Sequence, residues 1–218
     1  MALCYSVAEY CAPVWTRSAH TQLVDVQLNS TMRLISGTLQ QTPLAWLPVL
    51  SNIAPPALRR KAATERLVQQ VSQHPDWGLN KDLSNHPWYR LPSRHPLWKD
   101  AQSTDIATQW REDWKSAKVV NCDLVADPAI RQPGFDLPRM QWSLLNRFRT
   151  AQGPCRVNLK KWGLASSELC DCGVPQSMSH IVEQCPITKL DGGLKALHKA
   201  DNTACIWLTH KARNAFAK

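Results

Sequence analysis

Three cysteines and one histidine lie within the 16 residues from 170 to 185, and this cluster constrains the fold more than any other sequence feature. The segment reads CDCGVPQSMSHIVEQC, so the spacing is Cys-x-Cys, seven residues, His, four residues, Cys. Structural zinc sites use four cysteine or histidine ligands at the corners of a tetrahedron. We therefore predict one structural zinc ion, bound by Cys170, Cys172, His180 and Cys185.

The spacing also indicates how the chain could bring these ligands together. Cys170 and Cys172 point the same way if the backbone there is extended. His180 is expected in the first turn of a short helix, and at 3.6 residues per turn Cys185 would lie about 140° away from it. We therefore expect the helix to end before Cys185, because Pro186 disfavours a helical conformation in the residue that precedes it.

Two alternatives to a zinc site remain open for the cysteines. Eight cysteines could form four disulfides in a secreted chain, although five of them are scattered instead of clustered. The four side chains of the cluster could also bind nothing, with two of the cysteines acting as small buried apolar residues. The scattered cysteines are Cys4, Cys11, Cys122, Cys155 and Cys205.

The sequence gives no sign of a membrane span or a secretory signal. No run reaches the roughly 18 apolar residues that a span requires. The N-terminus, MALCYSVAEY, lacks the basic region that begins a signal peptide. We therefore expect an intracellular protein of the nucleus or cytoplasm, where thiols stay reduced.

The remaining pattern predicts a mainly α fold in three parts. Residues 1–73 have helical apolar spacing, and the helix expected at 20–35 is apolar around most of its circumference, as in a helix buried on all sides. Residues 74–103 form a Pro/Trp-rich connector, because their prolines interrupt any helix. Residues 104–218 are predicted to be a helical domain whose only β-hairpin is the zinc knuckle at 168–187.

The clearest amphipathic helix is expected at 137–150. One face is apolar and should pack on the core; it carries Leu137, Met140, Leu144, Leu145 and Phe148. The other face is expected to project outward; it carries Arg139, Trp142, Asn146 and Arg149.

Basic residues are concentrated just before the Cys/His cluster. Residues 137–169 contain six Lys or Arg against one Asp or Glu, in a chain of net charge +9. Arginine pairs with phosphates, and an exposed tryptophan stacks on unpaired bases. We therefore predict a nucleic-acid-binding surface made of Arg139, Trp142, Arg149, Arg156, Lys160 and Lys161. In the alternative, the charges are merely solvated and Trp142 packs inside the domain.

Two blocks of the sequence carry a family resemblance. The first starts at residue 5 and contains YSVAEYCAPVW, QLNSTMRLISGTLQQTPLAWLPVLSNIAPP and LRRKAA; the second, within 138–185, contains QWSLLNRFRTAQGPC, LKKWGL and the Cys/His cluster. Together they resemble the region downstream of the palm in non-LTR (LINE-type, jockey-like) retrotransposon reverse transcriptases. The resemblance implies a thumb-like helical segment at 1–73 and a zinc knuckle that binds element RNA or target DNA.

The resemblance assigns no catalytic residue to this chain. Polymerases of this class need paired aspartates to hold two metal ions, and the sequence contains no Asp-Asp pair. We therefore expect a non-enzymatic fragment that binds RNA or DNA and takes no small-molecule substrate. Two alternatives remain: a reverse transcriptase, as the family resemblance alone suggests, or an inert retroelement remnant with apolar surface exposed within 20–50.

Overall fold

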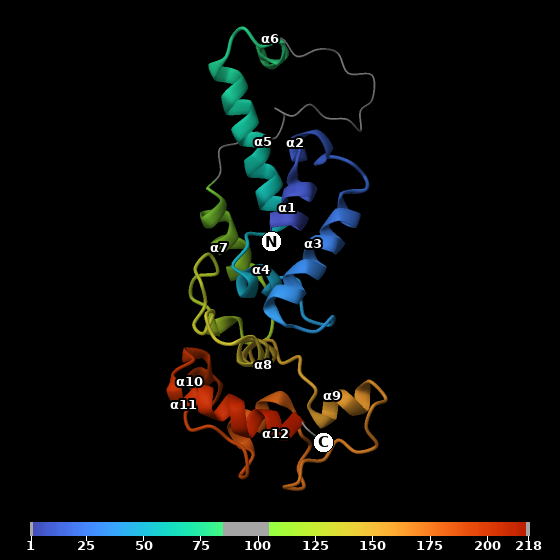
Figure 1. Ribbon diagram of the computed structural model, residues 1–218, viewed down its shortest axis with the longest axis vertical. Helices are drawn as coiled ribbons and strands as arrows, with labels where there is room; N and C mark the ends of the chain where they lie inside the picture. The colour runs from blue at the N-terminus through green and yellow to red at the C-terminus, as the bar shows by residue number, and fades with distance from the viewer. Residues whose placement is uncertain (1, 85–104, 217–218) are drawn as a thin grey trace. The chain divides into compact units, whose positions relative to one another are not determined.

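The structure is a computed structural model that describes residues 2–84 and 105–216 (Figure 1). The chain divides into two compact units, each assembled from two stretches of sequence. Unit 1 comprises Met1–Thr31 and Ala54–Asp113, and unit 2 comprises Met32–Ile53 and Trp114–Lys218. The two units interleave along the sequence, whereas the sequence-based division used three contiguous parts. Most of the predicted Pro/Trp connector, including 85–103, lies outside the described residues.

The prediction of a mainly α fold is confirmed. Across the described ranges, β pairing is limited to one isolated antiparallel bridge, between Leu169 and Pro175. The predicted β-hairpin at 168–187 is therefore reduced to a single bridge within an otherwise helical unit.

Unit 1 is organised around the long helix α5 (Pro56–Gln73), which starts with proline at its first helical position. Among its described residues, the other helices are α1 (Ala2–Glu9), α2 (Ala12–Trp15), most of α3 (Thr21–Ser36), α6 (Gly78–Ser84) and the first part of α7 (Ile106–Ser116).

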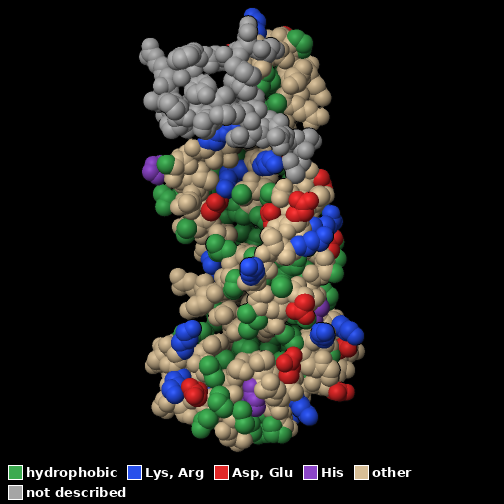
Figure 2. All heavy atoms as spheres, turned by 180° about the vertical axis from the view of Figure 1, so that it is seen from behind, with side chains coloured by type: hydrophobic (Ala, Val, Ile, Leu, Met, Phe, Trp, Pro, Cys, Tyr) green, Lys and Arg blue, Asp and Glu red, His purple; other side chains and the backbone are tan. Residues whose placement is uncertain are grey.

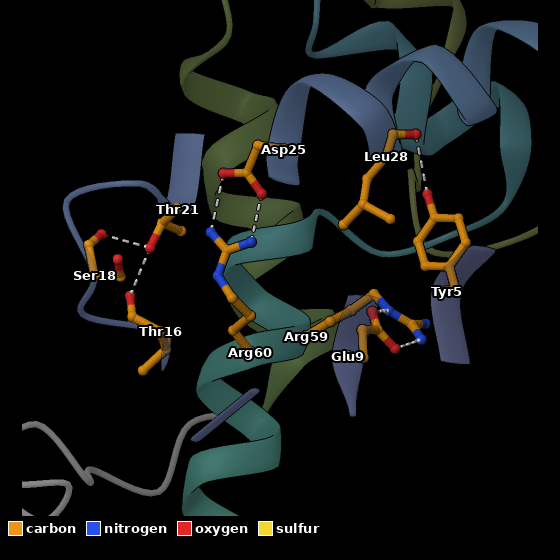
Figure 3. A network of polar contacts seen from close by, with 9 residues as sticks. All are labelled: Tyr5, Glu9, Thr16, Ser18, Thr21, Asp25, Leu28, Arg59 and Arg60. Carbon is orange, nitrogen blue, oxygen red and sulfur yellow. Dashed lines mark hydrogen bonds and ion pairs between the residues drawn. The ribbon is translucent and has the colours of Figure 1, made fainter. Parts of the chain in front are cut away.

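Two adjacent arginines of α5 tie this helix to its neighbours (Figure 3). The guanidinium group of Arg59 pairs with the carboxylate of Glu9 on α1 through two nitrogens, and Arg60 pairs in the same way with Asp25 on α3. Arg60 is buried, and the hydroxyl of Tyr5 donates to a backbone carbonyl of α3 nearby. The basic motif LRRKAA therefore has a structural role within unit 1.

Helix α3 is not buried on all sides, so that prediction is wrong. Leu28 and Met32 are buried, but Leu23 and Val26 are 66% and 60% exposed. The described residues therefore leave part of the apolar surface of α3 uncovered.

Unit 2 has its core around α8 (Arg139–Arg149), which packs against α10 (Gly193–Lys199) and η4 (Leu208–Ala212). Leu145, Phe148 and Leu197 are among its fully buried side chains. The remaining elements are α4 (Trp46–Ser51), the last residues of α7, η2 (Cys122–Leu124), α9 (Arg156–Lys161), η3 (His180–Gln184), α11 (Asn202–Trp207) and α12 (Arg213–Phe216).

Helix α3 ends at Ser36, and the next residue, Gly37, lies against α8 within unit 2. Gly37 has a φ of +68°, and its N–H donates to the carbonyl of Arg33 at 2.8 Å. A Cβ atom at this position would lie 2.0 Å from Oγ of Ser143 on α8. Both the positive φ and the close approach therefore require glycine.

Replacing Gly37 with alanine should destabilise unit 2 by about 2–4 kcal/mol, combining left-handed strain with displacement of Ser143. Gly163→Ala is the matched control, because Gly163 has a φ of +75° but no heavy atom near its added Cβ. That control should cost only about 1 kcal/mol. Urea unfolding of both variants measures the difference, and equal losses would show that the close approach to Ser143 is unimportant.

Candidate metal centre

The structure brings together the four predicted ligands in unit 2. One ligand atom from each of Cys170, Cys172, His180 and Cys185 lies within 4.8 Å of all the others. The Sγ atoms of Cys170 and Cys185 are 3.7 Å apart, and Sγ of Cys172 is 3.2 Å from Nε2 of His180. A tetrahedral ion with bonds of about 2.3 Å to sulfur and about 2.0 Å to nitrogen has edges of roughly 3.5–3.8 Å. The group could therefore hold a metal ion.

A tight reversal of the chain positions the first two cysteines. The N–H of Cys170 donates to the carbonyl of Val174 at 2.7 Å, and the N–H of Gly173 donates back to the carbonyl of Cys170 at 2.9 Å. Gly173 has a φ of +86°, which glycine adopts without steric strain. Cys172 lies inside this reversal and Cys170 at its start, so both sulfur atoms face the same centre.

A π-helical turn positions the other two ligands. Element η3 is a π-helix from His180 to Gln184, and the N–H of Cys185 donates to the carbonyl of His180 at 2.8 Å. In a π turn, residue i+5 bonds to residue i, so Cys185 returns to the side of His180. The prediction that the helix ends before Cys185 is correct, since η3 ends at Gln184 and Cys185 is extended. The assumption of α-helical geometry is wrong, because it places the two ligands about 140° apart.

Hydrogen bonds to the sulfur of Cys185 favour its metal-binding thiolate form. Burial raises the pKa of Cys185, but the Thr188 hydroxyl and the backbone N–H groups of Ile187 and Thr188 outweigh burial and lower the pKa to about 6. The Nε2 amide of Gln176 donates to the sulfur of Cys170 at 3.8 Å. A lowered pKa helps metal binding, because only the thiolate is a ligand.

His180 presents Nε2 to the cluster and is only 3% exposed. Its other ring nitrogen, Nδ1, is buried and has no hydrogen-bond partner among the described residues. Metal-bound histidines commonly donate from this second nitrogen to an oxygen acceptor. Here the ring is held by burial alone, while the backbone N–H of His180 donates to Oγ of Ser177 at 3.0 Å.

The nucleic-acid surface predicted on α8 is not formed as expected. Trp142 is 4% exposed and packs edge-on against Phe135, with 5.3 Å between the ring centroids. Arg149 is fully buried. Met140, predicted to be in the core, is 46% exposed. The buried face of α8 therefore includes Trp142 and Arg149, so the prediction that they project outward is wrong and the alternative of an internal Trp142 is correct.

Arg149 joins three segments of unit 2 inside the core. Its Nη2 donates to the carbonyls of Pro133 at 2.6 Å and His198 at 3.1 Å. Its Nη1 donates to Oδ1 of Asn146 and its Nε to Nδ1 of His198, both at 3.0 Å. Burial lowers the pKa of Arg149 to about 9. These acceptors occupy four of the five N–H donors of the guanidinium group, and its complete burial keeps a phosphate from reaching it.

Burial of the His198 ring, together with the nearby charge of Arg149, gives His198 a pH-dependent contribution to stability. Burial, followed by the charge of Arg149, lowers the pKa of His198 from 6.5 to about 4. The folded state therefore binds this proton less readily than the unfolded state does. The stabilisation is complete above about pH 6.5 and is lost as the pH falls toward about 4.

His198→Asn should reduce this pH dependence, because Oδ1 of asparagine can accept from Arg149 without titrating in that range. The difference in unfolding free energy between wild type and variant, measured by urea titration across this range, should shrink steadily as the pH falls. Any loss of the metal centre at low pH occurs in both proteins and cancels in the difference. A pH-independent difference would contradict the lowered pKa of His198.

Arg139 is exposed, as predicted, but its side chain binds the end of α3. Its guanidinium group donates to the carbonyls of Leu34 and Ile35, and Nδ2 of Asn146 donates to the carbonyl of Ser36 at 2.9 Å. The last carbonyls of a helix lack intrahelical partners and carry partial negative charge, which a cation stabilises. Arg139 therefore caps α3 within unit 2, and its predicted role in phosphate binding has no support from this position.

The other three predicted residues lie on α9. Arg156 pairs with Asp171 at 2.9 Å and Lys160 with Glu168 at 3.1 Å, so both side chains link α9 to the knuckle segment. Lys160 and Lys161 are exposed. On the face drawn in Figure 2, Lys and Arg side chains are interspersed with Asp and Glu side chains.

No protein-family model, curated protein or solved structure matches the chain. The relation to non-LTR reverse transcriptases therefore stays a prediction that depends on the sequence blocks described above. Within the described ranges, no helix combines the length and apolar character that crossing a membrane requires.

Proposed function

We propose that Cys170, Cys172, His180 and Cys185 hold one structural zinc ion. The convergence of their four ligand atoms within 4.8 Å is the observation that carries this proposal. Three thiolates and one imidazole form a soft ligand set that suits zinc. Four protein ligands would complete its coordination and leave no position for a substrate or a water molecule. The ion therefore organises the knuckle and does not catalyse a reaction.

We further propose that unit 2 is a nucleic-acid-binding module related to the C-terminal region of non-LTR reverse transcriptases. The charge distribution supports this proposal. Unit 2 contains 16 Lys and Arg against 8 Asp and Glu, so it carries a net +8 of the +9 of the chain. A strongly basic unit attracts polyanions. The sequence blocks that resemble this family, and the lack of an Asp-Asp pair, favour binding without polymerase activity.

The exposed lysines of α9 give this proposal a direct test. Zinc-loaded full-length chain should bind single-stranded RNA or DNA with an affinity that falls as salt increases. The double variant Lys160→Gln, Lys161→Gln should lower the slope of log K against log [salt] by about 1.4, or roughly 0.7 for each phosphate that a lysine no longer neutralises. Fluorescence anisotropy with labelled oligonucleotides across a salt series gives both slopes.

The matched control removes two exposed lysines from α10, Lys195→Gln and Lys199→Gln. This control should keep the wild-type slope if binding is centred on α9 and the knuckle. An equal effect of both double variants would indicate a diffuse charge effect. Folded, zinc-loaded protein that binds neither RNA nor DNA would contradict the proposed function.

An inert remnant is the second candidate, because part of the observed surface is strongly apolar. Within 20–50, Leu23, Val26, Leu34 and Leu44 are 58–71% exposed. Exposed apolar area of this kind promotes association. Light scattering of the full chain separates the two candidates: aggregation without nucleic-acid binding favours the remnant, and monodisperse protein that binds RNA or DNA favours the module.

A further inference from the structure

Two arginines on one side of α8 lie against the end of α3 within unit 2. Arg139 and Arg147 are eight residues apart, a spacing that places both on the same face of a helix. Arg139 donates to the carbonyls of Leu34 and Ile35, and Nε of Arg147 donates to the carbonyl of Gly37 at 3.4 Å. The last turn of α3 and the residue after it therefore hold both guanidinium groups in place.

Arg147 leaves most of its hydrogen-bonding capacity unused. A guanidinium group has five N–H donors, and the single contact of Arg147 is near the upper distance limit for a hydrogen bond. Within the described residues, its Nη1 and Nη2 atoms meet no acceptor, and no carboxylate pairs with Arg139 or Arg147. The side chain of Arg147 is only half-buried, so a ligand can reach its four remaining N–H groups.

The positive charge at this place is not compensated by acidic residues. Burial, followed by the charge of Arg139, lowers the pKa of Arg147. The two stretches that meet here, 32–53 and 137–153, contain four arginines and no lysine, aspartate or glutamate. Two cations that repel each other without a nearby acid favour the binding of an anion that supplies the opposite charge.

A nucleic-acid phosphate fits both the free donors and their position. The planar donors of arginine match the oxygen atoms of a phosphate in pairs. Gly153, in the turn after α8, lies beside Arg147, since an added Cβ would be 3.5 Å from the Cβ of Arg147. The carbonyl of Gly153 accepts from Nδ2 of Asn158 on α9 at 2.8 Å. Arg147 is therefore one turn of chain away from the helix that carries Lys160 and Lys161.

We propose that Arg147 binds one backbone phosphate of a single-stranded nucleic acid, with the guanidinium group of Arg139 adding positive charge beside it. This inference rests on the proposed nucleic-acid-binding function and extends the binding surface from α9 to α8. Arg147 takes the place of the predicted phosphate ligand Arg149, which is fully buried. The surface predicted from the sequence includes each Lys and Arg of 137–169 except Arg147.

The test compares Arg147 variants of the zinc-loaded full-length chain by anisotropy with labelled single-stranded RNA across a salt series. Arg147→Gln should weaken binding about tenfold and lower the slope of log K against log [salt] by about 0.7. Arg147→Lys keeps the charge but not the paired donors, so it should weaken binding about threefold with an unchanged slope. Arg131→Gln is the control, because Arg131 is exposed and pairs with Asp136; it should keep the wild-type affinity and slope.

Urea unfolding without RNA separates phosphate binding from a structural role of Arg147. Arg147→Gln loses one long hydrogen bond and relieves the repulsion with Arg139. Its unfolding midpoint should therefore equal or exceed that of the wild type. A residue that serves only to cap α3 would show the opposite, a lower midpoint with unchanged RNA binding.

The outcomes distinguish this inference from the proposed function. Wild-type protein that binds no RNA or DNA contradicts both. Wild-type binding that keeps its affinity and slope in Arg147→Gln overturns the assignment of Arg147 alone, and so does a lowered unfolding midpoint in that variant. Arg147-dependent binding of oligoglutamate that is tighter than binding of RNA of equal charge would also overturn it, by identifying a carboxylate as the ligand.

Discussion

Replacing Cys185 with serine is expected to abolish metal binding by the full-length chain and to lower the stability of unit 2 by at least about 3 kcal/mol. Cys185 is fully buried, and its sulfur lies 3.7 Å from that of Cys170. A serine hydroxyl is not deprotonated near neutral pH and cannot replace a thiolate ligand. Without the metal, the reversal at Gly173 is no longer linked to the π-helical turn. Metal analysis and urea unfolding measure the two effects.

Cys205→Ser is the control for this experiment. Cys205 belongs to unit 2 but lies outside the metal cluster. Its sulfur lies 3.7 Å from a backbone carbonyl, that of Ala200. This variant should keep one metal ion per chain and lose little stability. Wild-type metal affinity in the Cys185 variant would contradict the assignment of the ligands.

The second large effect is expected at Arg149, where replacement by methionine should destabilise unit 2 by about 4 kcal/mol or more. Four acceptor groups around the guanidinium group, one in a buried contact and three in partly buried contacts, would lose their donor, at up to about 1–3 kcal/mol for each group left unsatisfied. Removing an unpaired buried charge offsets part of this loss, as the lowered pKa of Arg149 indicates. The loss should prevail, because the carbonyls of Pro133 and His198 stay in place.

Two further variants make this prediction specific. Arg149→Lys keeps the charge but cannot reproduce the planar arrangement of donors, so an intermediate loss of about 2 kcal/mol is expected. Arg131→Met removes an arginine whose side chain is 64% exposed, and it should change stability by no more than about 0.5 kcal/mol. Urea unfolding that ranks the three variants differently would contradict the structural role of Arg149.

The metal ligands could be predicted from the sequence because the information is local. All four residues lie within 16 positions, and their chemistry limits what such a cluster can do. The π-helical turn was also predictable in principle. Five residues separate His180 from Cys185, and this spacing matches one i to i+5 turn better than an α-helix. An α-helical geometry alone does not predict this turn, because it places the two side chains about 140° apart.

The orientation of α8 could be predicted only in part. Trp142, Leu145 and Arg149 are spaced three and four residues apart, so they share one face, and the tryptophan could have identified that face as buried. The burial of Arg149 depends on acceptors from Pro133 and His198, which are 16 and 49 residues away. Long-range partners of this kind leave no periodic pattern in the sequence.

The capping role of Arg139 also depends on a long-range contact. Its carbonyl acceptors at Leu34 and Ile35 are 105 and 104 residues away. A basic residue at a helix surface has the same local pattern whether it binds phosphate or the end of another helix. Charge counts located the basic region of the chain but could not assign its individual residues.

The central claim is that this chain carries one structural zinc ion on three cysteines and one histidine. Metal analysis and X-ray absorption of purified full-length chain test it most directly. We expect one zinc per chain, with three sulfur neighbours at about 2.3 Å and one nitrogen neighbour at about 2.0–2.1 Å. Folded protein without zinc, or zinc surrounded mainly by oxygen, would contradict it.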